Sequence, residues 1–307
     1  MDFQSKTDAK VKQLLKENGL DYEIQKLPME AKGQNGENIE TPYFGIYNPK
    51  HEKFLYSSKE SYRVTQNEEI VKAIVEGTKK FANELDFYSV KDINYGSKLI
   101  ANLEIQGNEK FGNDKMKRFI SIMDSNDGSI GLKVGVGFLV YSCTNGLYMF
   151  KGDENSFNVK SKHTQSIEGK IHQLSSMVEG YMEKSFSMLD KFKQFQSTKV
   201  SRELVHELSS ELLGVSKAMT EKEMEKEGVS TRKTNQMEAL YRNMETELNS
   251  KGENLWGLLN GVTRWTTHEK SAPNRENGRI ESMTSGSNYK TNMEALEFVE
   301  NKYRELV

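Results

Sequence analysis

The chain has 307 residues, a formal net charge of −2 and a single cysteine, Cys143. A chain of this length buries a core without covalent staples, and one cysteine excludes both an internal disulfide and a cysteine-cluster metal site. The near-neutral isoelectric point of about 6.3 excludes a polybasic nucleic-acid binder, so a nucleic-acid site would have to be a local patch. No secretory signal and no apolar run of membrane-spanning length occurs, so we expect a cytoplasmic protein without a membrane partner.

The composition of the chain changes near residue 160. Before it, β-branched and aromatic runs are broken by Gly, Asn and Pro, and after it come long segments rich in Glu, Lys, Met and Leu. This change predicts an α+β fold, with a β-rich region with flanking helices over residues 1–160 and a helical region over residues 161–307. The two regions either form separate domains or join in one.

Short elements are expected in the first third of the chain. The apolar spacing predicts a helix over residues 7–17, and β-rich segments predict the strands 21–26, 43–47 and 53–56, the last two joined by a turn at Asn48-Pro49-Lys50. A further helix opens at residues 66–69, where Asn67 is a good N-cap and acidic residues fill the first turn.

A β-hairpin is the best-defined element of the sequence. A strand is predicted over residues 97–106, and two apolar runs, 118–123 and 130–141, flank an Asp127-Gly128 turn. The alternation places five apolar residues on one face of the second hairpin strand: Leu132, Val134, Val136, Phe138 and Val140. Its other face carries glycines and one lysine, Gly131, Lys133, Gly135 and Gly137, which is typical of close approach by another backbone or a ligand.

The second half of the chain is predicted to be helical. Apolar residues recur at steps of four and three over residues 167–195, which predicts a long helix with one buried seam. Shorter helices are predicted at residues 203–213, 220–227, 231–248, 255–265 and 293–303. The polar stretch over residues 267–288 is expected to be a long loop.

No catalytic, cofactor or metal motif is recognisable. The glycines of the hairpin lie inside a strand with no helix start after them, which excludes a dinucleotide fingerprint and a P-loop. The five histidines never pair at metal-ligand spacing. We therefore expect no cofactor, and we interpret Asp124 and Asp127 as turn residues and Cys143 as a structural residue.

Basic side chains gather near the hairpin, at the start of the long helix and after the helix at residues 255–265. They combine with an aromatic residue in a mixture suited to phosphate contact and base stacking. The candidate nucleic-acid-binding residues are Lys115, Lys117, Arg118, Lys133, Lys160, Lys162, His163, Lys170, Arg264, Trp265 and His268.

Several motifs occur in a fixed order along the chain: Ile122-Met123-Asp124-Ser125-Asn126-Asp127-Gly128-Ser129, then Cys143-Thr144-Asn145-Gly146-Leu147, then His163, then Trp256 with Asn260 and Thr263. From about Tyr22 to Tyr303 this series resembles the phage- and plasmid-borne prokaryotic family catalogued as domain of unknown function 932. Asp124 and Asn126 stand where that family usually has Asn and His. The resemblance implies a phage, prophage or plasmid context, and hence the host cytoplasm, more than a chemistry. A hairpin sheet backed by a long helix is also similar in architecture to the core of phage single-strand annealing proteins.

Three hypotheses about function follow. The first is a phage-associated protein that binds or anneals single-stranded DNA in recombination or replication, in a basic groove between the sheet and the long helix. The second is a non-enzymatic assembly module that uses the seam over residues 167–195 to form a homo-oligomer or to hold a phage or host protein. The third is an enzyme acting through Asn145, His163 or His268. A continuous positive groove would support the first hypothesis. An exposed apolar seam would support the second, and a buried polar pocket would support the third.

Overall fold

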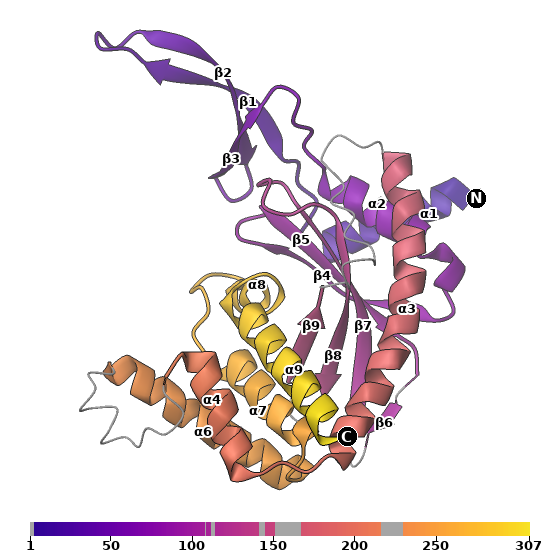
Figure 1. The fold of residues 1–307 in the computed structure, drawn as a ribbon. Coiled ribbons are helices and arrows are strands. Elements are labelled where there is room, and N and C mark those ends of the chain that lie inside the picture. Colours follow the sequence, from indigo (N-terminus) through magenta and orange to yellow (C-terminus); the bar gives the residue numbers. More distant parts are fainter. Residues whose placement is uncertain (1–2, 108, 112–113, 141–144, 151–166, 216–229) are drawn as a thin grey trace.

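Two antiparallel sheets fill the N-terminal half of the chain and helices fill the C-terminal half, which confirms the predicted α+β fold (Figure 1). The computed structural model describes residues 3–107, 109–111, 114–140, 145–150, 167–215 and 230–307. Within these ranges, no helix has both the length and the apolar character that a membrane crossing requires.

The smaller sheet projects from the body as an arm (Figure 1). It contains three antiparallel strands in the order β1 (Gln25–Lys32), β2 (Asn38–Asn48) and β3 (Lys53–Lys59). The strand predicted over residues 21–26 begins only at Gln25, because Ile24 is hydrogen-bonded on both its N–H and its carbonyl to the side chain of Gln66, at 2.9 Å each. This pair of bonds fastens the start of the arm to the body.

The larger sheet is antiparallel with the order β4-β5-β7-β8-β9, and β6 adds to β7. Its strands are β4 (Leu85–Ile93), β5 (Lys98–Ile105), β6 (Glu109–Phe111), β7 (Asp114–Ser125), β8 (Lys133–Val140) and β9 (Gly146–Met149). The predicted hairpin is confirmed as β7–β8, with Ile122 opposite Val134. The Asp-Gly turn is explained by Gly128, whose φ of +68° favours glycine. Strands β4, β6 and β9 were not predicted.

One face of this sheet, here called the core face, carries Val134, Val136 and Phe138 and is covered by three helices. These are α1 (Phe3–Glu17), α2 (Asn67–Gly77) and α3 (Ile167–Ser197), with the short 3-10 turn η1 (Lys79–Phe81) after α2. The predicted seam of α3 is buried from Leu174 onward, and the side chains before it lie outside the described ones. Phe192 of this seam lies 5.0 Å from the Phe138 ring and 4.9 Å from that of Trp256, so the seam is part of the core.

The N-cap of α2 differs from the prediction. Gln66 is the cap, in a reciprocal capping box with Glu69. Asn67 instead lies in the first turn, where its buried side chain donates to the carbonyl of Leu20 at 3.1 Å. Asn67 therefore joins α2 to the loop after α1.

The C-terminal half contains α4 (Arg202–Leu213), α6 (Thr231–Lys251), α7 (Leu255–His268), α8 (Gly278–Thr284) and α9 (Ser287–Leu306). Four of the predicted helices are confirmed, and the one at residues 220–227 lies outside the described residues. The long loop predicted over residues 267–288 is wrong, because this stretch contains α8 and the start of α9. Four of its polar side chains, Glu281, Ser282, Thr284 and Asn288, are buried and hydrogen-bonded within the chain, as in the 2.8 Å bond from Asn288 Nδ2 to the carbonyl of Thr266.

The face of the large sheet opposite the core face, here called the second face, carries the glycines of β8. A Cβ on Gly135 would lie 2.5 Å from the carbonyl oxygen of Met149, so glycine allows the backbone after β9 to lie directly against β8. The predicted close approach is therefore confirmed, and the neighbour is a backbone. Beside it, α8 and the start of α9 cover a small apolar cluster of Ile100, Met123 and Phe150 through Ile280 and Tyr289.

Candidate functional site

The predicted basic residues of the first half that the structure describes lie on both faces of the large sheet. Lys160, Lys162 and His163 lie outside the described residues, as does the side chain of Lys170 on α3. Lys115, Lys117 and Lys133 occupy alternate positions on β7 and β8 that face the second side of the sheet. Arg118 has the opposite orientation: it is buried under α3, with Nη1 3.3 Å from Ser185 Oγ and its guanidinium 4.2 Å from the centre of the Phe186 ring.

The three predicted nucleic-acid-binding residues near the C-terminus, Arg264, Trp265 and His268, differ in burial and in the residues that they contact. Trp265 is only 1% exposed, so it belongs to the core of α7, and the expectation that a base stacks on it is wrong for this fold. Arg264 lies nearby on α7 and forms an ion pair with Glu247 of α6 at 3.1 Å. His268, at the end of α7, lies with Nε2 3.3 Å from Asn145 Oδ1.

An aromatic row crosses the second face of the sheet and begins at Tyr148, which packs against the small apolar cluster beneath α8 and α9. Phe119 of β7 is opposite Gly137 of β8, which is opposite Tyr148 of β9, and the Tyr88 ring of β4 lies 4.9 Å from that of Phe119. A Cβ on Gly137 would lie 3.3 Å from the Tyr148 ring, so the glycine leaves room for that ring to lie over β8. Tyr88 is 52% exposed, which makes it the accessible member of the row.

Two lysines lie beside the aromatic row. Lys117 Nζ is 5.0 Å from the centre of the Tyr88 ring and 2.9 Å from Glu104 Oε2, and Lys115, on the same side of β7, is exposed. Burial raises the pKa of Tyr148 to about 12, so its hydroxyl stays protonated at neutral pH. The row thus combines one exposed ring, that of Tyr88, with positive charge beside it.

A ladder of polar side chains runs parallel to the aromatic row. Ser121 Oγ donates to Asn102 Oδ1 at 2.7 Å, and Asn102 Nδ2 donates to Ser89 Oγ at 3.1 Å. These bonds join β7, β5 and β4 on the second face, where Asn102 and Ser121 are both buried. The ladder fixes the strands beneath the aromatic row, which keeps the exposed ring in position.

The Asn145-Gly146-Leu147 part of the Cys-x-Asn-Gly-Leu motif lies at the end of α7, whereas Cys143, interpreted as a structural residue, lies outside the described residues. Gly146 N–H donates to Thr267 Oγ1 at 3.2 Å, next to the contact between Asn145 and His268. Asn145 is 2% exposed, and its Nδ2 has no hydrogen-bond partner within the described part of the chain. Asn145 and His268, two residues of the enzyme hypothesis, therefore adjoin each other, while His163 lies outside the described residues.

The Trp-x-x-x-Asn-x-x-Thr motif is structural. Asn260 Nδ2 donates to the carbonyl of Trp256 at 2.9 Å, and Thr263 Oγ1 donates to the carbonyl of Asn260 at 3.1 Å. All three side chains are buried within α7. The motif therefore satisfies the polar groups of a buried helix, whose Trp256 ring contacts Phe192 of α3.

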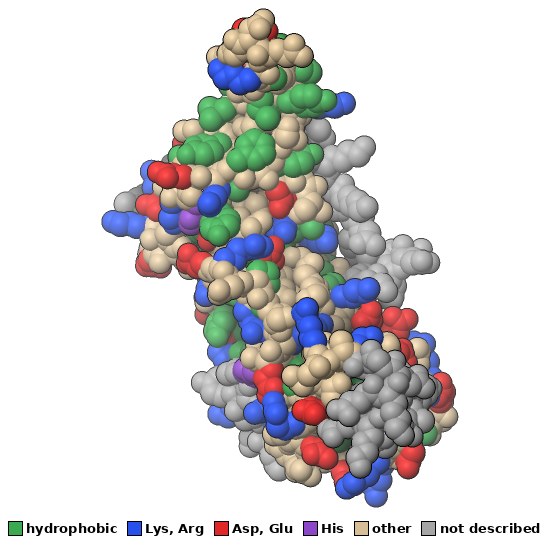
Figure 2. Space-filling view, turned by 90° about the vertical axis from the view of Figure 1, so that its left-hand side faces the viewer, with side chains coloured by type: hydrophobic (Ala, Val, Ile, Leu, Met, Phe, Trp, Pro, Cys, Tyr) green, Lys and Arg blue, Asp and Glu red, His purple; other side chains and the backbone are tan. Residues whose placement is uncertain are grey.

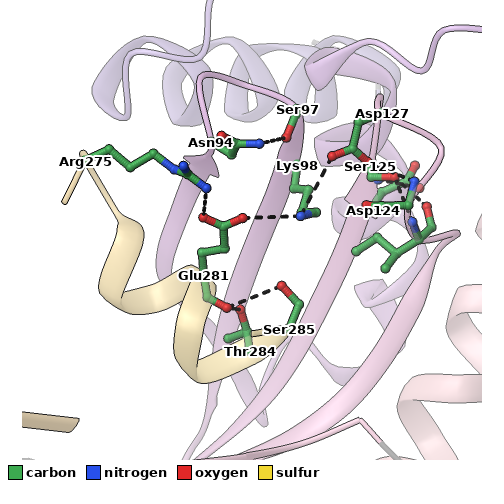
Figure 3. A network of polar contacts seen from close by, with 12 residues as sticks. Asn94, Ser97, Lys98, Asp124, Ser125, Asp127, Arg275, Glu281, Thr284 and Ser285 are labelled. Carbon is green, nitrogen blue, oxygen red and sulfur yellow. Dashed lines mark hydrogen bonds and ion pairs between the residues drawn. The ribbon is translucent and has the colours of Figure 1, made fainter. Parts of the chain in front are cut away.

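The Asp124–Ser129 segment joins a buried charge network (Figure 3). Lys98 Nζ of β5 lies 3.4 Å from Glu281 Oε1 and 3.8 Å from Asp127 Oδ2, and Arg275 Nη2 forms an ion pair with Glu281 at 2.5 Å. Burial disfavours the Asp127 carboxylate, but hydrogen bonds from Ser129 and the charge of Lys98 outweigh it, so the pKa of Asp127 lies below its ordinary value. The network connects α8 to the hairpin turn.

Two other residues of the hairpin motif, Asp124 and Asn126, accept hydrogen bonds from backbone N–H groups. Asp124 Oδ1 accepts from Ser125 N–H at 3.0 Å, and Asn126 Oδ1 accepts from Thr65 N–H at 3.1 Å. No group of three His, Cys, Asp or Glu side chains in the described ranges is placed to hold a metal ion. Asp124 and Asp127 were interpreted as turn residues. The contacts of Asn126 with Thr65, and of Asp127 through Lys98 with Glu281, show that the turn also positions α2 and α8.

Sequence reasoning missed the residues that make the second face distinctive. Tyr88 lies on a strand that was not predicted, and Lys98 and Glu281 were not recognised as partners. Alternation along residues 85–93 is a usable signal for β4, but a bulge between Phe87 and Ser89 interrupts it. The buried pairing of Lys98 with Glu281 joins residues far apart in the chain and leaves no local signal.

The sequence model of one protein family, described as Domain of unknown function (DUF932), matches residues 55–292. This chain belongs to that family. No match was found among curated proteins or among solved structures. The matched range begins within β3 and ends in α9, so it includes the whole large sheet and most of the helices, whereas β1 and β2 of the arm precede it.

Proposed function

We propose that this chain binds single-stranded nucleic acid on the second face of its large sheet, over the aromatic row. The observation that carries the proposal is the exposed Tyr88 ring, supported beneath by Phe119 and flanked by Lys117 and Lys115. An antiparallel sheet that presents an aromatic ring beside lysines is a surface on which unpaired bases stack while phosphates contact the cations. In keeping with the ordered motifs, the ligand would be single-stranded DNA of a phage or plasmid, in recombination or replication.

The arrangement favours single strands over duplexes. A base stacks on Tyr88 only if its own face is free, and both faces of a base are covered by neighbouring pairs inside a duplex. The lysines supply sequence-independent attraction, because phosphate contacts carry no base information. Glu104, which pairs with Lys117 at 2.9 Å, offsets part of this attraction. The phosphate contacts that remain should make the affinity fall as salt rises.

Fluorescence anisotropy titrations with single- and double-stranded oligonucleotides at several salt concentrations test the proposal. We expect tighter binding of the single strand, with affinity that falls as salt rises. Tyr88→Ala should weaken single-strand binding by about 1–3 kcal/mol with little change in salt dependence, because it removes stacking. Lys115→Ala should instead lower the salt slope by about 0.7, because it removes one phosphate contact.

Phe186→Ala is the matched control, since the Phe186 ring on α3 is about as exposed as that of Tyr88 and also lies beside a cation, Arg118. It should bind as the wild type does. Equal losses of affinity from Tyr88→Ala and Phe186→Ala would show that the position of the exposed ring does not matter. No binding by the wild-type chain at low salt would refute the proposal.

A further inference from the structure

Two carboxylates lie in the same line across the large sheet as the aromatic row. Asp86 of β4 is directly opposite Glu104 of β5, and Glu104 is directly opposite Phe119 of β7. Residues opposite each other on neighbouring strands share a face, so Asp86 and Glu104, here called the acidic pair, lie on the second face beside Phe119. Asp86 is exposed and the Glu104 side chain is 24% exposed, so a ligand on this face can reach both carboxylates.

The acidic pair is unfavourable for the sheet that carries it. Like charges directly opposite each other destabilise two paired strands. Glu104 is partnered by Lys117 at 2.9 Å, whereas Asp86 Oδ2 accepts a 2.7 Å hydrogen bond from Gln106 Nε2, a group without charge. The stability of the sheet therefore does not explain why two carboxylates lie at this place.

The acidic pair lies close to the ring on which a base would stack. Lys117 Nζ is 2.9 Å from Glu104 Oε2 and 5.0 Å from the centre of the Tyr88 ring, and Asp86 lies two residues before Tyr88 on β4. The Glu104 carboxylate is therefore within about 10 Å of the ring, which is the Debye length at 0.1 M salt. A phosphate placed over Tyr88 is repelled at this distance, whereas an uncharged base is not.

The charges around the aromatic row nearly cancel. Two lysines, Lys115 and Lys117, lie beside the two carboxylates of the acidic pair. Among the described residues on the side of the molecule that Figure 2 shows, bases and acids are interspersed and neither forms a continuous surface. Phosphate alone therefore gains little at the row, and a ligand needs a base on Tyr88 to bind well.

We propose that the acidic pair selects which ligands the second face accepts. Its charges repel a ligand that presents phosphate to Tyr88, such as a duplex, and admit a single strand that lays an uncharged base on the ring. This inference rests on the function proposed above and adds the residues that set its specificity. Specificity is a difference between affinities, so repulsion of the wrong ligand contributes to it as well as attraction of the right one.

An abasic strand tests the proposal, because it presents phosphates without bases. In fluorescence anisotropy titrations the wild type should bind a thymidine oligonucleotide more tightly than an abasic strand of equal length or a duplex. Glu104→Gln should raise the affinity for the abasic strand and for the duplex about fivefold, because it removes a like charge near the phosphates. The affinity for the thymidine strand should rise about twofold or less, so the selectivity for bases should fall.

Asp86→Asn separates repulsion by the acidic pair from release of Lys117. Asp86 bonds to Gln106, so its neutralisation makes no lysine available to a phosphate. The selectivity for bases should nevertheless fall, by about twofold, because Asp86 is exposed and its charge is screened by salt. A loss of selectivity in Glu104→Gln alone would mean that release of Lys117 is the cause, and would overturn selection by repulsion.

Glu300→Gln is the matched control. The Glu300 side chain of α9 is 23% exposed and pairs with Lys191 at 2.7 Å, much as Glu104 pairs with Lys117. This variant changes the net charge by the same amount and should keep the selectivity of the wild type. An equal change in Glu300→Gln would reduce the effect to net charge and overturn the inference.

The same titrations distinguish failure of this inference from failure of the proposed function. A wild type that binds the thymidine strand, together with a Glu104→Gln variant of unchanged selectivity, would overturn the role of the acidic pair and leave the proposed function intact. A wild type that binds no strand at low salt would refute the proposed function, and this inference with it.

Discussion

The two sheets are built from the same antiparallel hairpins but differ in what lies against them. In the large sheet, six of the eight residues of β5 are buried, because helices and the C-terminal half cover both faces. In the arm, five of the eleven residues of β2 are exposed and only three, at its inner end, are buried. The presence of paired strands therefore does not tell how much a sheet contributes to stability. The sheet whose faces are covered contributes to the core, and the sheet whose face is exposed is available for binding.

A charge placed in each of the two sheets should give the largest difference in the free energy of unfolding. Val136→Asp should unfold the chain, because Val136 is fully buried on the core face. A neutral polar group buried without a hydrogen bond already costs about 2–7 kcal/mol, and an ionised carboxylate costs more. Ile39→Asp, at an exposed position of β2 in the arm, should change the free energy of unfolding by no more than about 0.5 kcal/mol. Thermal unfolding followed by circular dichroism measures both. A stable Val136→Asp variant would contradict the assignment of the core.

Two phenylalanines of α3, one buried and one half-exposed, should show a smaller difference in stability of the same kind. Phe192 is buried against Phe138 and Trp256, so Phe192→Ala should destabilise the chain by about 3–5 kcal/mol. Phe186, on the same helix, is about half-exposed over Arg118, and Phe186→Ala should cost about 1 kcal/mol. Urea titrations of the two variants should therefore differ clearly, and equal midpoints would mean that the α3 seam is not packed as described.

The smallest effect concerns the charge network at the edge of the large sheet. The folded-state pKa of Asp127 is depressed, so its stabilisation is present above its unfolded pKa of about 4 and is lost as the pH falls through the folded value. Asp127→Asn should therefore be less stable than the wild type at neutral pH, by about 1 kcal/mol or less, and the difference should shrink in acid. Unfolding measured between neutral pH and acid checks this. A difference that does not vary with pH would exclude a role for the Asp127 charge.

Local patterns were sufficient for much of the fold. The β7–β8 hairpin and the seam of α3 follow from alternation and from steps of three and four along the chain. β1 was predicted only at its start, as a strand over residues 21–26, because Gln25–Lys32 contains Pro28 and charged residues without alternation, as suits an exposed strand. The segment around α8 was misread because its polar residues are buried in pairs, and composition alone does not distinguish a paired polar group from a solvated one.

The candidate site was harder to predict than the fold. The aromatic row joins Tyr88, Phe119 and Tyr148 from three strands, and only the register of the sheet brings these residues together. Trp265 looked available beside its basic neighbours, but the apolar pattern of α7 places it inside. By contrast, the glycines of β8 were informative, because they marked the face where other backbone and rings lie close.

The central claim, that nucleic acid lies on the second face of the large sheet, is tested most directly by ultraviolet cross-linking of a bound single-stranded oligonucleotide and mass-spectrometric mapping of the attached peptides. Cross-links should form on the peptide that contains Tyr88, the accessible ring of the row, and Tyr88→Ala should remove them. Cross-links confined to the arm or to α7, under conditions where binding is saturated, would contradict the account.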